Sequence, residues 1–328
     1  MGTESKDVRA KAIARSKTSA KKSSSTLYLA VVAALVAVAI GIASIFDGSA
    51  LSFYDAGKET KEQSKPSGDL VEATLLDGPW RQQIDRAPLD PREKVVEGCH
   101  VPKTWRHVED GFFSDEEVDT LLNMVERGMA QSRSNLGGPT ILDVNSGFMK
   151  DGEGVQIIYE GPNAVSFTTE EYAVYARMFD RIRERIMEIN GMNILYFTAP
   201  TFVARIVGNE SWTPQEIHDE YWHPHVDKDN TPHYDMSGLV YLTTHGEDFQ
   251  GGEFVFLDED KPTTVRPRRG RFITFSSGPE NPHRFTQVTS GTRYCFSMWF
   301  SCDKRHQFKT FLDGKVHRAF HSERSDQS

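Results

Sequence analysis

The chain has 328 residues, of which 38% are hydrophobic and 26% charged, and its formal net charge is −9. This length allows one large folded domain with further segments, and the acidic charge argues against a nucleic-acid enzyme, whose binding surface is basic. The sequence contains no internal repeat and no phosphate-binding glycine loop, which excludes repeat architectures and P-loop nucleotide chemistry.

The first 46 residues predict a basic tail followed by a membrane anchor. Residues 1–26 contain seven Lys or Arg against Glu4 and Asp7, and residues 27–46 form an uncharged apolar run. As a helix this run is long enough to cross a bilayer core of about 30 Å. An uncleaved signal-anchor is favoured over a signal peptide, whose apolar core is usually only about 7 to 15 residues. The positive-inside rule predicts a cytosolic tail and a lumenal remainder, as in a type II single-pass protein of the endoplasmic reticulum or Golgi.

Residues 47–105 are interpreted as a stem, because their first part is rich in Ser, Gly, Lys and Glu. Residues 106–200 predict a helical support region with two apolar stripes, and the second helix is expected to end near Gly191. The helices start at two capping boxes, which are Ser114 with Glu117 and Thr168 with Glu171. The stripes are Val118, Leu121, Leu122, Val125 and Met129 in the first helix, and Tyr175, Phe179, Ile182, Ile186 and Ile189 in the second.

Short runs of β-branched and aromatic residues, separated by turn residues, dominate the chain from residue 201 to residue 305. Strands at this spacing predict an all-β sandwich or barrel, here a double-stranded β-helix or jelly roll. The expected class is therefore α+β, with residues 306–328 as a C-terminal tail. The strands are expected at 237–243, 253–257, 264–266, 271–275 and 292–300, with turns at 251–252, 267–270 and 290–291.

Three side chains in this β region form a candidate metal site. In an extended strand His225 and Asp227 project from one face, while Val226 turns away from it. His283 is expected to open another strand and to supply a third ligand, and Arg293 follows ten residues later. Two imidazoles and one carboxylate are the facial ligand set of non-haem Fe(II) oxygenases, and a buried guanidinium suits a dicarboxylate.

A second metal site is compatible with strand parity. His223 and His225 with Asp229 would give a cupin-like arrangement, since all three share one face with Asp227. That arrangement gives Arg293 no role, and Asp229 lies in a polar run that is expected to have left the strand. On the first interpretation, His223 and His233 shape the mouth of the pocket or face water.

The histidine, aspartate and arginine pattern resembles the prolyl 4-hydroxylase-like branch of the 2-oxoglutarate oxygenases. Five runs resemble one membrane-bound member of that branch, namely PTFVARI (200–206), HDEYWHPHVDK (218–228), EDFQGGEFVF (247–256), SSGPENPHR (276–284) and GTRY (291–294). The resemblance is strong over roughly the last 130 residues and concerns only the layout of the anchor and stem. It implies Fe(II), 2-oxoglutarate and ascorbate as cofactors.

Residue roles follow from the same resemblance. His225, Asp227 and His283 match the iron ligands. Arg293 matches the residue that binds the 5-carboxylate of 2-oxoglutarate, and Tyr241 matches a tyrosine that helps to hold it. Some relatives have a further tyrosine ten residues before the first ligand, but Gln215 stands there in this chain, so a second contact to the cosubstrate is not identified.

Two further features agree with a lumenal domain. Asn209 begins the sequon Asn-Glu-Ser, which predicts a glycoprotein if the domain is in the lumen. The chain has three cysteines, so one of them has no intramolecular partner. Cys295 shares the face of Arg293, which leaves Cys99 with Cys302 as the pair if a disulfide forms. Metal binding by Cys99 and His100 is a weaker alternative, since no second cysteine cluster supports a zinc site.

Three functions are consistent with the sequence. The leading hypothesis is a membrane-anchored dioxygenase that hydroxylates a protein or peptide in the secretory pathway and releases succinate and CO2. The second is an oxygenase-fold binding module without turnover. The third is a cupin-type metalloenzyme that needs no 2-oxoglutarate.

Overall fold

A computed structural model describes residues 74–132, 137–152, 154–199, 201–209, 211–214 and 220–308. The predicted cytosolic tail and the predicted anchor lie outside these residues. Within these ranges no helix is both long and apolar enough to span a bilayer.

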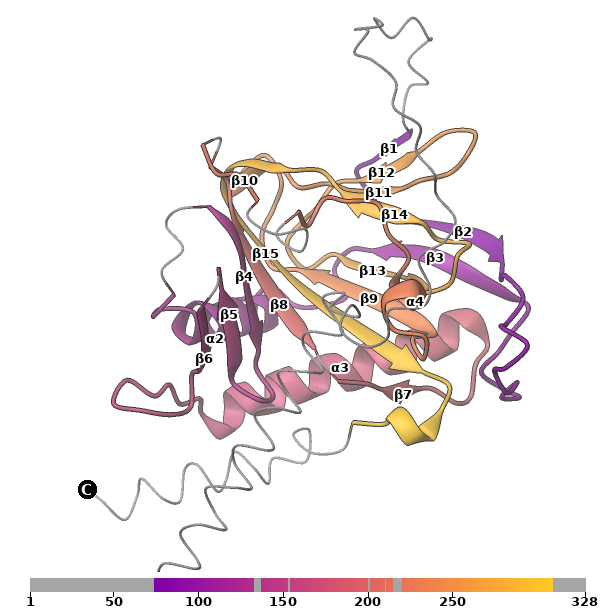
Figure 1. Cartoon of the computed structure of the whole chain (residues 1–328), viewed down its shortest axis with the longest axis horizontal. Coiled ribbons are helices and arrows are strands. Elements are labelled where there is room, and N and C mark those ends of the chain that lie inside the picture. The colour runs from indigo at the N-terminus through magenta and orange to yellow at the C-terminus, as the bar shows by residue number, and fades with distance from the viewer. Residues whose placement is uncertain are drawn as a thin grey trace, which may run out of the picture. The chain divides into compact units, whose positions relative to one another are not determined.

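The described residues form two β-sheets and two long helices (Figure 1). The smaller sheet has the order β1 (Thr74–Leu76), β12 (Thr263–Val265), β11 (Phe254–Phe256), β14 (His283–Phe285). The larger sheet has the order β2 (Trp80–Asp85), β3 (Lys103–Glu109), β13 (Phe272–Ser276), β9 (Met236–Tyr241), β15 (Val288–Ser301), β8 (Phe202–Val207), β4 (Gly138–Asp143), β5 (Phe148–Asp151), β6 (Gly154–Ile157). Two short strands, β7 (Tyr196–Phe197) and β10 (Phe249–Gly251), pair with β15.

One apolar cluster joins the two sheets. Side chains from the smaller sheet interdigitate with side chains from β9, β13 and β15, as expected when each strand turns alternate residues inward. The cluster residues include Leu239, Tyr241, Phe254, Phe256, Val265, Ile273, Phe275 and Cys295, all of them buried. The predicted β-sandwich core is thereby confirmed as a jelly-roll-like arrangement.

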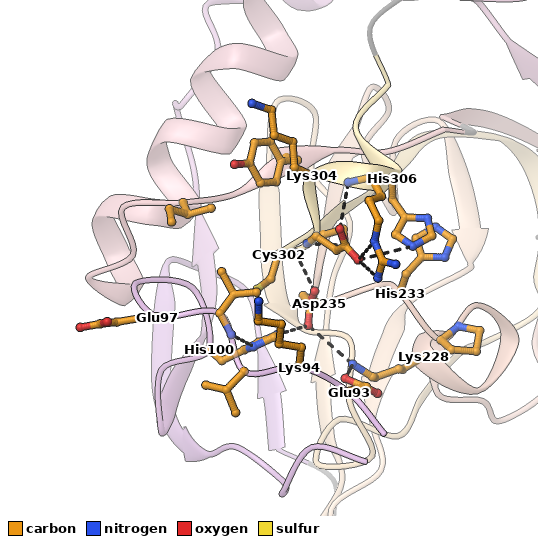
Figure 2. A pocket seen from close by; sticks show the side chains of 18 of the residues that line it. Glu93, Lys94, Glu97, His100, Lys228, His233, Asp235, Cys302, Lys304 and His306 are labelled. Atoms are coloured by element: carbon orange, nitrogen blue, oxygen red, sulfur yellow. Dashed lines mark hydrogen bonds and ion pairs between the residues drawn. The ribbon is translucent and has the colours of Figure 1, made fainter. Parts of the chain in front are cut away.

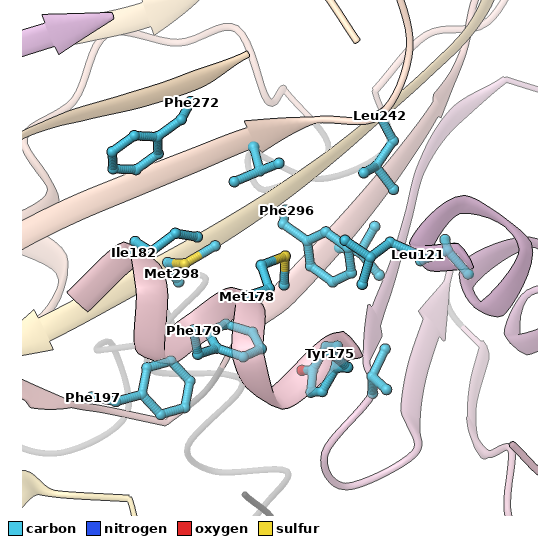
Figure 3. Packing of buried hydrophobic residues seen from close by; sticks show 14 of the residues in the cluster. Leu121, Tyr175, Met178, Phe179, Ile182, Phe197, Leu242, Phe272, Phe296 and Met298 are labelled. Carbon is cyan, nitrogen blue, oxygen red and sulfur yellow. The ribbon is translucent and has the colours of Figure 1, made fainter. Parts of the chain in front are cut away.

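The opposite face of the larger sheet packs on the helices. Both capping boxes are confirmed, for α2 (Asp115–Gly128) and for α3 (Thr169–Asn190). Helix α3 ends at Gly191, whose φ of 65° is readily available only to a residue without a Cβ. In Figure 3, Ile182 of α3 lies beside Met298 of β15, and Tyr175 of α3 packs against Phe296 with ring centroids 6.0 Å apart. The helices therefore support the sheet from outside the jelly roll, as predicted.

Three predictions about element placement were incomplete or wrong. Residues 74–105, expected to be a stem, contain β1 and β2 and begin β3, and residues 106–200 contribute β4 to β6 as well as the helices. No turn occurs at residues 290–291, because β15 continues through them. Gly291 is needed for a different reason, since a Cβ there would lie 2.1 Å from the carbonyl oxygen of Asp248. The glycine permits the close approach of β10.

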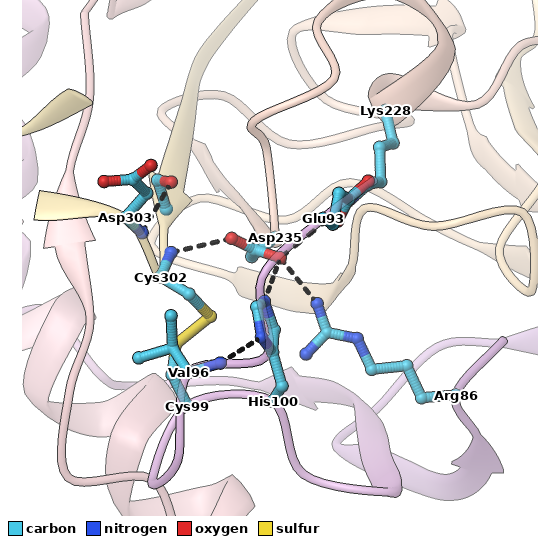
Figure 4. Close-up of a disulfide and its surroundings, with 10 residues drawn as sticks. Arg86, Glu93, Val96, Cys99, His100, Lys228, Asp235, Cys302 and Asp303 are labelled. Carbon is cyan, nitrogen blue, oxygen red and sulfur yellow. Dashed lines mark hydrogen bonds and ion pairs between the residues drawn. A yellow bond between two sulfur atoms is a disulfide. The ribbon is translucent and has the colours of Figure 1, made fainter. Parts of the chain in front are cut away.

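A disulfide connects the two ends of the described chain. Cys99, in the loop between β2 and β3, is bonded to Cys302 just after β15, which confirms the predicted pair. Cys295 is free and buried. Beside the disulfide, the Asp235 carboxylate accepts hydrogen bonds from the Cys302 amide, His100 and Arg86 (Figure 4). Burial alone would raise the pKa of Asp235, but these bonds and the charges of Lys228 and Arg86 lower it to about 2.

Candidate metal centre and cosubstrate pocket

A pair of backbone hydrogen bonds brings the two predicted histidine ligands together. The amide of His225 donates to the carbonyl of His283 at 2.9 Å, and the reverse bond is 3.0 Å long. The pair forms an isolated antiparallel bridge, in which His225 lies opposite His283, the first residue of β14. As a result the imidazole centroids lie 4.3 Å apart.

The third predicted ligand reaches the same place by a different local structure from the one expected. Val226 has φ −119° and ψ 128°, so His225 and Asp227 do project to one side. However, Asp227 does not continue a strand; it begins the short helix α4 (Asp227–Asn230). The prediction that one strand continues from His225 through Asp227 is therefore wrong. The side chains of His225 and Asp227 nevertheless project to the same side, as predicted.

The three side chains converge. Asp227 Oδ1 lies 3.7 Å from Nε2 of His225 and 3.9 Å from Nε2 of His283. One ligand atom from each residue lies within 4.8 Å of the others, a separation that one metal ion can bridge. A second such group in the described ranges is His100, Asp235 and Cys302, but its cysteine is in the disulfide.

Hydrogen bonds orient each of these side chains. Nδ1 of His225 donates to the carbonyl of His223, and Nδ1 of His283 donates to that of Asn281, both at 3.0 Å. A ring that donates through Nδ1 presents the lone pair of Nε2, as a metal ligand requires. Burial lowers the pKa of His283 and keeps it neutral. Ser237 Oγ donates to Asp227 Oδ2 at 2.6 Å, which leaves Oδ1 directed at the imidazoles.

Arg293 is buried without a carboxylate partner. Its side chain is on the strand β15, and the residue is 2% exposed. Nη1 donates to the carbonyl of Gly252 at 2.9 Å, whereas Nε has no partner. The guanidinium lies 4.4 Å from the ring centroid of Phe285 and 5.7 Å from that of Tyr221. No ion pair to Arg293 is found within the described part of the chain, although a buried charge normally requires one.

Two tyrosines flank this arginine. Tyr241 is fully buried, and its hydroxyl group has no hydrogen-bond partner. Burial raises the pKa of Tyr241 well above its usual value, so the phenol remains a donor. Tyr221, which was not singled out in the sequence, accepts a hydrogen bond from the Val288 amide and also covers Arg293. Gln215, at the position of the missing tyrosine, lies outside the described residues.

The donor set and the pocket fit the implied cofactors. Two imidazoles and one carboxylate, each oriented by a backbone or serine contact, match the facial ligands of non-haem Fe(II). An unpaired guanidinium beside an unpaired phenol provides the charge and the donors that a dicarboxylate needs.

The cupin-like alternative does not form. His223 Nδ1 is directed to the carbonyl of Glu220, and Asp229 is exposed on α4. His223 lies beside His225, with ring centroids 5.3 Å apart, but it belongs to neither of the two groups of convergent metal-ligating atoms found among the described residues. The set of His223, His225 and Asp229 is therefore contradicted by the geometry.

A large cavity lies away from the three candidate metal-ligating side chains. A cavity of about 980 Å³ opens beside the disulfide and is lined by Lys228, Asp235, His233 and His306, among others (Figure 2). His233 stacks on His306 with ring centroids 3.8 Å apart, and burial lowers its pKa to about 4. The metal-ligating residues do not line this cavity, so its size does not identify the reaction site. His233 faces this cavity rather than the mouth of the metal site.

A jelly-roll-like core with an imidazole, imidazole and carboxylate cluster beside a buried arginine defines a non-haem iron oxygenase. The family described as the 2OG-Fe(II) oxygenase superfamily matches residues 214–301. The chain is similar to 2-oxoglutarate and iron-dependent oxygenase domain-containing protein 3 of Rattus norvegicus, with 35% identity over 244 residues. The aligned region covers 73% of this chain and 74% of that protein. The chain therefore belongs to the 2OG-Fe(II) oxygenase superfamily and is a dioxygenase that depends on Fe(II) and 2-oxoglutarate.

Further similarities are weaker. Prolyl 3-hydroxylase 1 of Mus musculus is 29% identical over 271 residues, which are 75% of this chain and 34% of that protein. Among solved structures, a 2OG-Fe(II) oxygenase-family oxidoreductase from Burkholderia pseudomallei covers 60% of this chain and 84% of its own, at 14% identity and a TM-score of 0.42.

The two neighbouring histidines allow a test of the metal site. We expect His225→Ala to lose most Mn(II) binding, because it removes a convergent nitrogen ligand. His223→Ala is the matched control and should bind Mn(II) within about twofold of the unaltered protein, as expected for a residue outside the ligand set. Calorimetric titration with Mn(II) measures both. Equal losses in the two variants would contradict the assignment.

Proposed function

We propose that His225, Asp227 and His283 hold Fe(II) and that Arg293, with Tyr241, binds the 5-carboxylate of 2-oxoglutarate. The observation that carries this proposal is the buried guanidinium of Arg293, for which the described residues provide no counter-ion. A dianionic cosubstrate would supply the missing charge. The proposal also accounts for the orphaned hydroxyl group of Tyr241, which would become a hydrogen-bond donor to the same carboxylate.

The side chains have distinct tasks in this function. Fe(II) held by these residues would supply the oxidation chemistry, in which 2-oxoglutarate, O2 and a substrate C–H bond give succinate, CO2 and an alcohol, with one oxygen atom of O2 entering succinate and the other the hydroxyl group. His225, His283 and Asp227 fix the position of that chemistry, because their second atoms are held by two carbonyls and by Ser237. Arg293 orients the cosubstrate, and the rings of Phe285 and Tyr221 exclude water from its guanidinium. Ascorbate stays a prediction from the family resemblance.

The arginine provides a sharp test of the cosubstrate site. Arg293→Ala should weaken binding of the analogue N-oxalylglycine at least tenfold, because it removes a charge-assisted contact worth about 1.5–3 kcal/mol. Its affinity for Mn(II) alone should change much less, since no metal-ligating atom is altered. Two successive calorimetric titrations separate these constants.

A nearby arginine is the matched control for this test. The side chain of Arg284 donates only a long bond, of 3.5 Å, to the carbonyl of Phe285. Arg284→Ala should therefore leave the affinity for N-oxalylglycine within about twofold. The role of Arg293 would be refuted if its variant lost Mn(II) and the analogue to the same extent. The metal assignment itself fails if the unaltered protein binds no Mn(II).

The substrate is proposed to be a protein or peptide side chain. Support comes from the relatives, since one is named as a prolyl 3-hydroxylase. Membranes from cells with the active protein should contain a peptide that is heavier by one oxygen atom than in cells expressing Asp227→Ala. Quantitative mass spectrometry of secretory-pathway proteins makes this comparison. A protein substrate would be contradicted if the active protein forms succinate in these cells but no peptide differs in mass between them and the cells expressing Asp227→Ala.

The domain is further proposed to lie in the secretory lumen, anchored by residues 27–46. The support is the uncharged run, the basic tail and the sequon at Asn209. Asn209 and Ser211 form a local turn, in which Asn209 Oδ1 accepts a hydrogen bond from the Ser211 amide, and Ser211 is exposed. The sequon is thus at the surface on its serine side.

Glycosidase treatment tests this topology. The protein expressed in cells should lose the mass of one N-glycan on digestion, and Asn209→Gln should have the digested mass from the start. Ser211→Ala is an independent variant that removes the same acceptor signal without altering the asparagine. Protease treatment of sealed microsomes should leave the domain intact. Digestion of the domain in sealed microsomes would show that it faces the cytosol.

A further inference from the structure

Arg106 is a fully buried cation that the metal and cosubstrate assignments do not use. It lies on β3, outside the residues that match the superfamily, and is 2% exposed. The side-chain pattern of β3 buries Thr104, Arg106 and Val108 on one face. An arginine therefore occupies a position on the buried face of this strand, which is costly unless its donors are satisfied.

All of its nitrogen atoms donate hydrogen bonds, and two of the four bonds go to the segment before His283. Nε donates to Asn281 Oδ1 at 2.6 Å, and Nη2 donates to the carbonyl of Glu280 at 3.1 Å. Nη1 donates to Asp258 Oδ1 at 2.6 Å and to Gln82 Oε1 at 3.2 Å. The guanidinium thus joins the loop that ends at His283 to the end of β11.

Asn281 transmits this arrangement to the imidazole. Its amide nitrogen donates to the carbonyl and to Oγ of Ser276, both at 2.8 Å, so the side chain is held at both ends. Its backbone carbonyl accepts the Nδ1 hydrogen bond of His283. One residue therefore connects the guanidinium of Arg106 with the bond that selects the tautomer of His283 and the direction of its Nε2.

Packing gives a second connection between the same residues. The guanidinium of Arg106 lies 4.3 Å from the ring centroid of Phe256. Phe256 is the direct cross-strand partner of His283 in the smaller sheet. The cation over this ring holds β11 in place, and β11 is the strand that pairs with His283. Arg106 of β3 is thus connected to the imidazole of His283 in two ways, by hydrogen bonds through Asn281 and by packing through Phe256.

We infer that Arg106 is a positioning residue for the metal site, acting through Asn281 and Phe256 on His283. This inference rests on the proposed function, because it assumes that His283 is a metal ligand. A purely structural arginine would stabilise the sheet without affecting the metal. A positioning residue also changes the affinity and the coordination geometry of the bound ion.

The test compares metal binding by variants that remain folded. Arg106→Lys retains the charge but loses the planar fork that reaches Asn281 and Glu280 together. Mn(II) affinity should fall about tenfold, the lower end of the range for loss of a partner that orients a ligand. The visible absorption of the Co(II)-substituted protein should change in band shape, because His283 is misaligned. A loss of stability alone would leave the band shape unchanged.

Two further variants keep the inference falsifiable. Arg271 is also fully buried and makes a bidentate pair with Asp110, so Arg271→Lys controls for the general cost of altering a buried arginine. Asp258→Asn weakens one contact of Arg106 at a partly exposed site, and it tests the idea if Arg106→Lys does not fold. It should reduce Mn(II) affinity in the same direction, by a smaller factor. Thermal unfolding followed by circular dichroism confirms that each titrated variant is folded.

The outcomes separate this inference from the proposed function. The inference is overturned if Arg106→Lys binds Mn(II) within about twofold of the unaltered protein with the same Co(II) spectrum. It is also overturned if Arg271→Lys has equal effects on affinity and spectrum. If the unaltered protein binds neither ion, the proposed metal site itself is wrong, whatever the variants do.

Discussion

The site depends on the backbone bridge between His225 and His283. Two hydrogen bonds between their main chains place residues from distant parts of the sequence side by side, before any metal is considered. Backbone carbonyls then direct both Nε2 atoms to one point, and a single extended residue, Val226, brings Asp227 to the same point. The geometry of the ligands is therefore determined by main-chain contacts, which makes it insensitive to rotation of exposed side chains.

The pocket is electrostatically unbalanced without a ligand. Arg293 has been removed from water, yet its contacts in the described structure are a carbonyl and two aromatic rings, not a carboxylate. Rings above a guanidinium offset part of the desolvation cost but do not neutralise the charge. Tyr241 adds a phenol that remains protonated and unpaired. Arg293 Nε and the Tyr241 hydroxyl group thus have no partner among the described residues, which is the reason for proposing a dicarboxylate as their common ligand.

Local signals in the sequence were sufficient for much of this arrangement. Two capping boxes located the helices, and alternating apolar residues located most strands of the jelly roll. The ligand triad followed from side-chain parity and from family resemblance, although Asp227 begins a helix. Strand β1 was missed because it has only three residues, and β2 because most of its residues are polar. Both are held by pairing, with β12 and β3 respectively. Tyr221 has no local pattern that distinguishes it. Arg106 is distinguished by its position, since it lies between Thr104 and Val108 on the buried face of β3.

The N-terminal part of the described chain is integral to the oxygenase core. Strand β3 pairs with β13, and its Thr104 and Arg106 bind the segment from Ser276 to Asn281. The disulfide ties the loop before β3 to the end of β15, where Asp235 also pairs with Lys228, the residue next to Asp227. Residues 214–301 include the three proposed ligands, His225, Asp227 and His283, but the groups that orient them come partly from residues before 110. The range that matches the superfamily is therefore smaller than the part of the described chain that positions the proposed site.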